Sequence, residues 1–165
     1  MTIYIWIILA VCVLDQLTKV WAMDLIAAAN NLPTGQIAEG NTLPIRENIL
    51  HFTYLENPGM SFGLFADHRW VFMLLSTVGI LALFVYLIYL KGSGKLVCTS
   101  LALVIGGGIG NMFDRIFLGY VVDFVDVRCI PLWKWIFNLA DSAVCIGAAL
   151  LVLATVLEYK KELKK

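Results

Sequence analysis

Residues 70–90 form a run of 21 residues without a charged side chain. A helix rises 1.5 Å per residue, so about 20 apolar residues cross the roughly 30 Å hydrocarbon core of a bilayer. The composition agrees, because 61% of the residues are hydrophobic and 15% are charged, against roughly 45–50% and about 25% in soluble domains. The sequence therefore predicts an integral membrane protein and argues against a water-soluble globule.

Three further apolar stretches are long enough to span a membrane, at residues 3–23, 96–113 and 135–157. The first contains Asp15 and Lys19, and the last is interrupted by Asn138 and Asp141. The first stretch lacks the basic segment of a secretory signal peptide and is apolar for longer, so we expect a retained helix. The predicted fold class is an all-α membrane protein, with a four-transmembrane-helix bundle in a single domain over residues 1–165.

Lysine positions predict the orientation of this bundle, because Lys and Arg concentrate in cytoplasmic connections. Six lysines occupy two short segments on one side of the membrane: Lys91, Lys95, Lys160, Lys161, Lys164 and Lys165. The opposite side has two longer connections, residues 24–69 and 114–134, with few basic residues. We therefore expect both termini in the cytoplasm and both long connections outside it.

The first outer connection contains a strand-like segment. Residues 50–55 alternate in polarity and precede the turn sequence Asn57-Pro58-Gly59, which is typical of a strand followed by a turn. We expect a small extracytoplasmic β element here. The net charge is 0, so no basic patch for nucleic acid is expected.

Ionisable residues inside the predicted spans gather at the outer boundary. Trp135 marks that boundary, and Asp141 follows six residues later, so we expect it roughly 9 Å into the membrane. Asn138 is then expected on nearly the same helix face as Asp141. Such residues at membrane depth are costly unless they are paired or hydrated, so they mark candidate functional sites.

This clustering helps to separate classes of function. A proton-coupled transporter subunit tends to place ionisable groups near the midplane, whereas an enzyme acting at one leaflet needs them at one interface. Paired carboxylates can share a proton and activate water, so the clustering favours an enzyme; a non-catalytic assembly factor stays open. The histidines, His51 and His68, have no neighbouring ligand pattern, and we expect neither a metal site nor a cofactor.

Five ordered motifs between residues 15 and 141 carry a family resemblance: DQLTK at 15–19, NPGMSFG at 57–63, GGIGNMFDR at 107–115, VVDF at 121–124 and FNLAD at 137–141. Each motif is weak alone. Their order on a four-span chain resembles lipoprotein signal peptidase, also called signal peptidase II. That bacterial aspartyl peptidase family removes signal peptides from lipid-modified prolipoproteins.

The resemblance implies roles for particular residues. It implies that Asp123 and Asp141 are the catalytic pair. It also implies that six residues support the site or bind the substrate: Asn57, Asn111, Arg115, Asn138, Asp15 and Lys19. Asp114, beside Arg115, is expected to be an ion-paired structural acid.

The resemblance further implies a substrate and a location. The expected partners are prolipoproteins whose cysteine carries a diacylglyceryl group, cleaved just before that cysteine, together with membrane lipid. The expected location is the bacterial cytoplasmic membrane, with a monomeric enzyme whose active site lies near the outer face. Two features depart from the family pattern, Met60 and a longer stretch over residues 27–41, and both concern the geometry of the outer loop.

Several of these residues also have simpler structural interpretations. Asp15 and Lys19 have the spacing of an intrahelical ion pair. Arg115 could anchor a helix end at the membrane interface. Asn57 could serve only to form the turn in which it lies. Glycines between Gly106 and Gly110 favour close helix packing.

Overall fold

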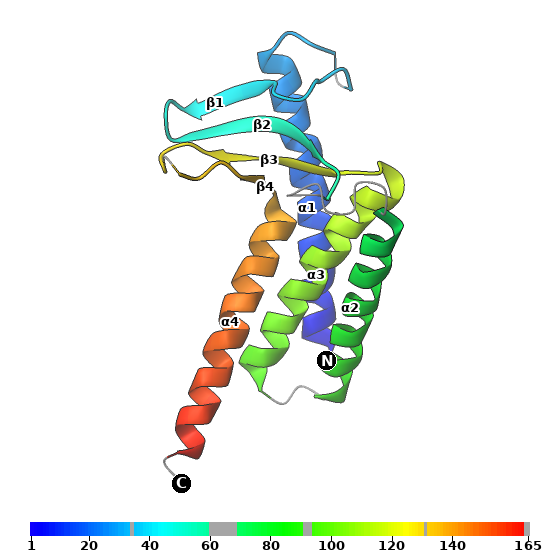
Figure 1. The fold of residues 1–165 in the computed structure, drawn as a ribbon, viewed down its shortest axis with the longest axis vertical. Coiled ribbons are helices and arrows are strands. Elements are labelled where there is room, and N and C mark those ends of the chain that lie inside the picture. The colour runs from blue at the N-terminus through cyan, green and yellow to red at the C-terminus, as the bar shows by residue number, and fades with distance from the viewer. Residues whose placement is uncertain (34, 60–68, 91–93, 131, 164–165) are drawn as a thin grey trace.

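In a computed structural model, four helices form a bundle and four strands form a small sheet across one end of it (Figure 1). The structure describes residues 1–33, 35–59, 69–90, 94–130 and 132–163. The helices are α1 (Thr2–Ala29), α2 (Arg69–Tyr89), α3 (Lys95–Phe117) and α4 (Leu139–Glu162). The strands are β1 (Thr42–Arg46), β2 (Leu50–Asn57), β3 (Val121–Val127) and β4 (Ile136–Phe137). The predicted small β element is confirmed, and it is a four-stranded antiparallel sheet.

Helix α3 is the centre of the bundle, because α1, α2 and α4 all pack against it. Glycines allow this close approach. A Cβ atom on Gly106 would lie 3.1 Å from the Ile8 carbonyl oxygen of α1, and one on Gly107 would overlap the Ala140 carbonyl oxygen of α4. A Cβ atom on Gly147 of α4 would likewise lie 2.7 Å from the Ser100 carbonyl oxygen of α3. The predicted role of these α3 glycines in close helix packing is confirmed.

The sheet is antiparallel throughout, with the order β1-β2-β3-β4. Strand β2 contains the predicted segment 50–55 and pairs with β3, so that Leu55 lies opposite Asp123. Helix α1 continues to Ala29, beyond the predicted span end at residue 23, because Ile26 packs in a core with Tyr54 and Val122 of the sheet. This contact joins the sheet to the bundle.

The last helix begins later than the predicted span start at residue 135. Ile136 and Phe137 pair with Asp126 and Val125 of β3, so the backbone is extended there and α4 begins at Leu139. Asp141 therefore lies in the first turn of α4. The sequence-based depth of roughly 9 Å was wrong, because it assumed six helical residues between Trp135 and Asp141.

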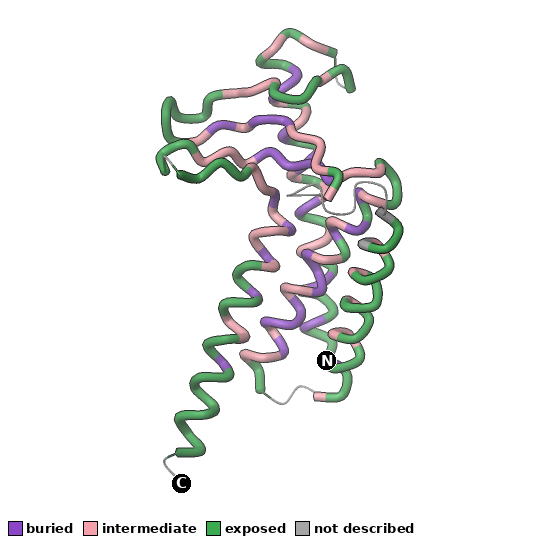
Figure 2. The backbone as a smooth tube through the Cα atoms, viewed as in Figure 1, coloured by how far each residue is buried: buried purple, intermediate pink, exposed green. Residues whose placement is uncertain are grey.

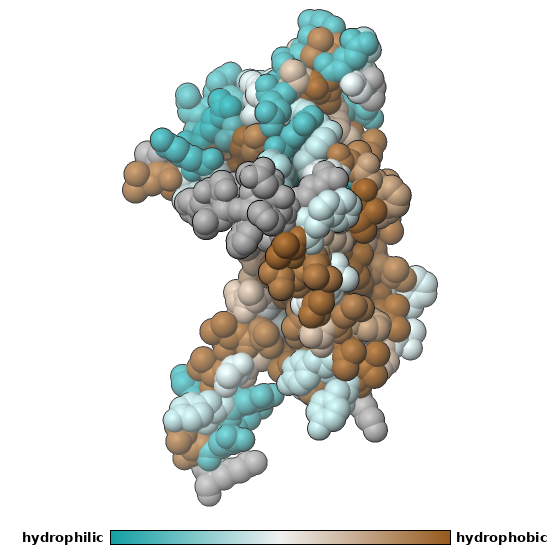
Figure 3. Space-filling view, turned by 45° about the vertical axis from the view of Figure 1, so that its right-hand side comes forward, coloured by the Kyte–Doolittle hydropathy of each residue, from teal (hydrophilic) through white to brown (hydrophobic). Residues whose placement is uncertain are grey.

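The surface of the helices is apolar. Figure 2 shows buried residues concentrated in α3 and the sheet, while much of α4 is exposed. In Figure 3 a hydrophobic band lies between a hydrophilic sheet end and a hydrophilic tip at the C-terminal end of α4. Three helices are long and apolar enough to span a membrane, α1, α3 and α4, and α2 contributes the shorter apolar helix Met73–Tyr89. This surface is that of a membrane protein.

Candidate active site

Polar side chains gather where α1, α3 and α4 meet the sheet. Five of them are almost completely buried, at 0–2% exposure: Asp15, Lys19, Asp114, Asp123 and Asn138. Burial of polar groups is costly without hydrogen bonds, and burial of charges is costlier still without partners. Their contacts therefore decide whether this cluster is stable.

Lys19 has three acceptors around its ammonium group. Its Nζ lies 2.7 Å from Asp15 Oδ2 and 2.7 Å from Asp114 Oδ2, and it donates to Asn111 Oδ1 at 3.2 Å. Three donors thus meet three acceptors. The predicted Asp15–Lys19 ion pair is confirmed. The prediction that Asp114 is ion-paired is also confirmed, but the ion pair that the structure shows is with Lys19 on another helix.

The two acids that hold Lys19 also position other elements. Asp15 Oδ1 accepts a hydrogen bond of 2.9 Å from the Ala140 backbone N–H in the first turn of α4. Asp114 Oδ2 accepts one of 3.1 Å from the Val122 backbone N–H in β3. Gln16 also donates to Asp114 Oδ1, at 2.8 Å. It was not predicted as a site residue, although its position within the motif DQLTK could have indicated this role.

Asn138 joins the two candidate catalytic acids. It is the N-cap of α4, with its Oδ1 accepting from the Asp141 N–H at 2.9 Å and its own N–H donating to Asp141 Oδ2 at 3.2 Å. Its Nδ2 donates to Asp123 Oδ1 at 2.7 Å. The expectation that Asn138 lies beside Asp141 is confirmed, but Asn138 precedes the helix as its N-cap and is not part of a helical face.

Asp123 is enclosed on β3. Asn57 Nδ2 donates to its Oδ2 at 2.8 Å, and Asn138 holds its other oxygen. Burial, together with the negative charge of Asp141, raises the pKa of Asp123 to about 7, even though the hydrogen bonds from Asn57 and Asn138 and the charge of Lys19 act to lower it. A carboxyl in this state holds a proton near neutral pH and can donate it.

Asp141 lies beside the space open to a substrate. Its Oδ1 accepts a hydrogen bond of 2.7 Å from Asn111 Nδ2, and its Oδ2 accepts one from the N-cap backbone. It occupies the third position of α4, where the positive end of the helix dipole favours a negative charge. These contacts hold the Asp141 carboxyl group in one orientation at the start of α4.

Asn57 and Arg115 meet at the turn that follows β2. Asn57 Oδ1 accepts a hydrogen bond of 2.9 Å from the Gly59 N–H, which stabilises the turn. Asn57 therefore forms the turn and also, through Nδ2, bonds Asp123. A Cβ atom on Gly59 would lie 3.3 Å from Arg115 Nε. Arg115 Nη1 donates to the Asn111 carbonyl oxygen at 3.3 Å, which keeps the guanidinium at the site. Met60, the first departure from the family pattern, lies outside the described residues.

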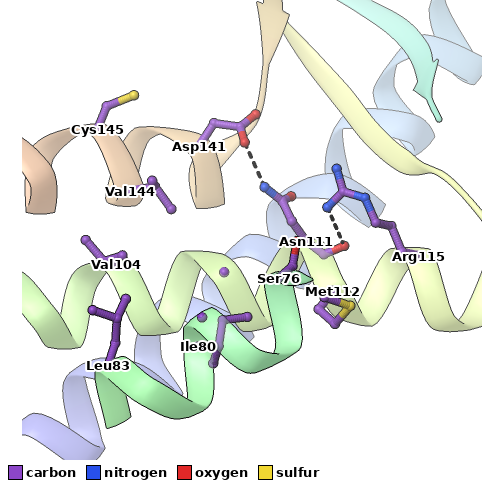
Figure 4. A pocket seen from close by; sticks show the side chains of 12 residues that line it. Ser76, Ile80, Leu83, Val104, Asn111, Met112, Arg115, Asp141, Val144 and Cys145 are labelled. Carbon is purple, nitrogen blue, oxygen red and sulfur yellow. Dashed lines mark hydrogen bonds between the residues drawn. The ribbon is translucent and has the colours of Figure 1, made fainter. Parts of the chain in front are cut away.

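A groove of about 580 Å³ runs inward from Asp141 between α2 and α4, with α3 as its floor (Figure 4). Asn111, Arg115 and Asp141 line its polar end. The rest of the lining is mainly apolar: Ser76, Gly79, Ile80, Leu83, Val104, Gly108, Met112, Val144 and Cys145. The site thus combines two linked carboxylates with an apolar groove, an arrangement suited to acid–base hydrolysis of a substrate with an apolar segment.

Within the described residues, no group of three or more His, Cys, Asp or Glu side chains is placed to hold a metal ion. His51 lies in the sheet, with Nδ1 3.4 Å from Thr42 Oγ1. His68 lies outside the described residues.

Comparisons with known proteins agree on one family. A family model for signal peptidase (SPase) II matches residues 7–157. A lipoprotein signal peptidase of Halothermothrix orenii is 40% identical over 147 residues, which cover 89% of this chain and 90% of that protein. One from Clostridioides difficile is 38% identical over 90% of this chain and 91% of that protein.

Solved structures agree in fold. A bacterial membrane enzyme structure at 1.9 Å resolution superposes with a TM-score of 0.71 and 25% identity, covering 94% of this chain and 93% of that one. A second, at 2.3 Å resolution, has a TM-score of 0.73 and 24% identity, covering 98% and 92%.

The burial of Lys19 leads to a stability prediction. Lys19→Met leaves Asp15 and Asp114 without their shared cation, and breaking a buried ion pair in this way costs about 3–5 kcal/mol. Arg128→Met is the matched control, because it breaks the partly exposed Arg128–Asp126 pair and costs about 1 kcal/mol or less. Unfolding in detergent, followed by tryptophan fluorescence, measures both. Equal losses in the two variants would contradict the assignment.

The environment of Asp123 predicts a pH-dependent stability. Because its folded-state pKa of about 7 lies above the ordinary 3.8, the folded state binds this proton more tightly, and stability falls as pH rises from about 4 through 7. Asp123→Asn removes that penalty. The variant should be more stable than the parent at pH 8, by up to about 4 kcal/mol, with the gap closing toward pH 4.

Melting curves at several pH values test this, with Asp126→Asn on the same strand as the control. A gap between parent and Asp123→Asn that does not change with pH would show that Asp123 does not hold the proton.

Proposed function

The chain belongs to the signal peptidase II family, and we propose that Asp123 and Asp141 are its catalytic carboxylates, so that it works as an aspartic endopeptidase. It is a peptidase that removes signal peptides from prolipoproteins. The alternatives, a proton-coupled transporter subunit or a non-catalytic assembly factor, have no support from these relatives. The observation that carries the aspartic assignment is that Asn138 bonds both acids at the polar end of the groove.

The proposed reaction uses one proton shared by the pair. Asp141 takes a proton from water, whose oxygen attacks the carbonyl carbon of the cleaved peptide bond, while protonated Asp123 donates to the carbonyl oxygen. In the second step the tetrahedral intermediate collapses, the C–N bond breaks and the departing nitrogen receives a proton from the pair. The new carboxyl terminus and the free amine then leave.

The surrounding charges favour this shared proton. Four described carboxyl groups, Asp15, Asp114, Asp123 and Asp141, face the two cations Lys19 and Arg115. Lys19 is already held by Asp15 and Asp114. The remaining two acids, Asp123 and Asp141, therefore have little positive charge to share, which favours a single proton held between them.

The other site residues have supporting roles in this proposal. Asn57 and Asn138 orient Asp123, and Asn111 orients Asp141. Asp15 and Lys19 hold the helices in register. Arg115 and Asn111, which line the groove beside Asp141, position the carbonyl groups of the substrate backbone.

The apolar groove is suited to bind the apolar segment of a signal peptide. A signal peptide carries an apolar segment of about 7–15 residues, and the groove offers an apolar path inward from Asp141. Cleavage takes place just before the diacylglyceryl-modified cysteine, whose acyl chains remain in the surrounding membrane lipid. No metal or organic cofactor takes part in this proposal.

The proposal includes a topology. All four helices of the single domain span the bacterial cytoplasmic membrane, with both termini in the cytoplasm and the sheet and active site at the outer face of a monomer. The four lysines near the C-terminal end of the chain, Lys160, Lys161, Lys164 and Lys165, support this orientation. Helix α2 has 21 residues, about the number needed to cross.

Substitution of either acid tests the chemistry. Asp123→Asn and Asp141→Asn should each reduce cleavage of a lipidated precursor by about 10²-fold or more, because general acid–base catalysis contributes about 10²–10⁴-fold. Asp126→Asn, on β3 but outside the cluster, should keep most of the activity. The measurement is cleavage by the purified protein in detergent or vesicles.

The same assay includes a non-lipidated precursor, which should be cleaved poorly. Retained cleavage in Asp141→Asn would overturn the catalytic pair, and equal cleavage of the two precursors would overturn the lipid requirement.

Thiol labelling tests the topology. Cys129 is exposed in the connection after β3, so a membrane-impermeant maleimide should label it in intact spheroplasts, and Cys129→Ser should lose that label. A Lys161→Cys substitution added to Cys129→Ser should be labelled only after permeabilisation. Labelling of position 161 in sealed spheroplasts would contradict a cytoplasmic C-terminus.

A further inference from the structure

Gly79 of α2 differs from the other described glycines. Five of those have a positive φ angle that favours glycine: Gly35, Gly40, Gly59, Gly94 and Gly119. Five more lie in helices, where a Cβ atom would meet a neighbouring side chain or backbone within 3.1 Å: Gly106, Gly107, Gly108, Gly110 and Gly147. Gly79 has neither feature, because its φ is not positive and a Cβ atom there would meet no atom of the described residues within 4 Å.

A glycine in a helix interior is less favourable than alanine, and the described neighbours of Gly79 leave room for a larger side chain. Packing within the chain therefore does not explain why glycine occupies this position. Gly108 provides the contrast. It lies across from α2, where a Cβ atom would come within 3.1 Å of two Ile80 side-chain carbons. Gly108 is therefore small so that α2 and α3 can approach, whereas Gly79 leaves open space.

The open space lies in the groove that ends at Asp141. Gly79 and Gly108 both line it, together with Ser76 and Ile80, and Figure 4 shows Ser76 and Ile80 on α2 facing α3. Gly108 precedes Asn111 by three residues, or about 4.5 Å along α3, and Asn111 bonds Asp141. The space at Gly79, next to Ile80, therefore lies about one helical turn inward from the catalytic end.

We propose that Gly79 is a specificity-determining residue, whose missing side chain makes room in the groove for a bulky apolar side chain of the signal peptide shortly before the cleaved bond. This rests on the proposed function, in which the signal peptide runs inward from the catalytic pair. The apolar segment of a signal peptide lies ahead of the residues at the cleavage site, and the groove is mainly apolar inward from Asp141, so the side chain that enters is aliphatic or aromatic.

A size exchange between enzyme and substrate tests this proposal. Gly79 is changed to Ala, Val and Leu. Each purified variant is assayed on lipidated precursors in which each of the four residues before the cleaved bond is, in turn, Leu or Ala. One misplaced methylene-sized group in an apolar pocket changes specificity about 10–200-fold. At one of the four substrate positions, we therefore expect the kcat/KM of Gly79→Leu to be at least about tenfold below that of the parent enzyme when the precursor has Leu. When the precursor has Ala at that position, we expect the kcat/KM of the variant to return to that of the parent enzyme.

Ala82→Leu is the matched control, because Ala82 is exposed on α2 and does not line the groove. It should cleave all precursors like the parent. The graded series keeps the test informative if Leu at 79 impairs folding, because Ala and Val should give smaller losses in the order of their size.

The outcomes separate the inference from the function on which it rests. Unchanged cleavage by Gly79→Leu, or an equal loss on every precursor, would overturn the role of Gly79 while leaving the catalytic pair intact. Full activity of Asp141→Asn in the same assay would overturn the proposed function itself.

Discussion

The burial of one ammonium group organises this protein. Lys19 is 2% exposed, and its charge is tolerated because Asp15, Asp114 and Asn111 meet all three of its donors. A charge in such a setting is expensive unless every donor is satisfied, so the positions of α1 and α3 are tightly coupled. The two acids then extend the coupling, because Asp15 bonds the start of α4 and Asp114 bonds β3. Asp141 and Asp123 lie on these two elements.

Close packing around α3 complements this polar network. Glycines bring α1 and α4 into backbone contact with α3, and α2 packs on the same helix. The groove between α2 and α4 then has α3 as its floor and Asp141 at its polar end. The result is a polar end that is fixed by hydrogen bonds and an apolar groove whose lining includes residues as small as Gly79. In the proposals made above, catalysis depends on the first feature and selectivity on the second.

Much of the site was predictable, but its geometry was not. Asp15 and Lys19 reveal their ion pair through spacing alone, because residues four apart meet on a helix. Asn138 was recognised as a site residue beside Asp141 but not as the N-cap, since nothing in FNLAD shows that Ile136 and Phe137 pair with β3 and delay the helix. Asp114 was assigned its role through its neighbour Arg115, whereas its ion-pair partner Lys19 is far away in the sequence. Gln16 was missed because an amide carries no charge that marks it as costly at that depth.

The sequence by itself determined that this chain enters a membrane and that the ionisable groups inside its apolar spans lie toward one end of them, because hydrophobic transfer free energies add along consecutive residues and need no knowledge of contacts. Its ordered motifs also indicated the family. Only the tertiary structure decided that Asp123, on a strand, and Asp141, in the first turn of a helix, share Asn138. It also decided that Asp123 is buried deeply enough to hold a proton near neutral pH. Both properties depend on distances and solvent exclusion between segments that are separate in the sequence, and these exist only once the helices and the sheet have packed.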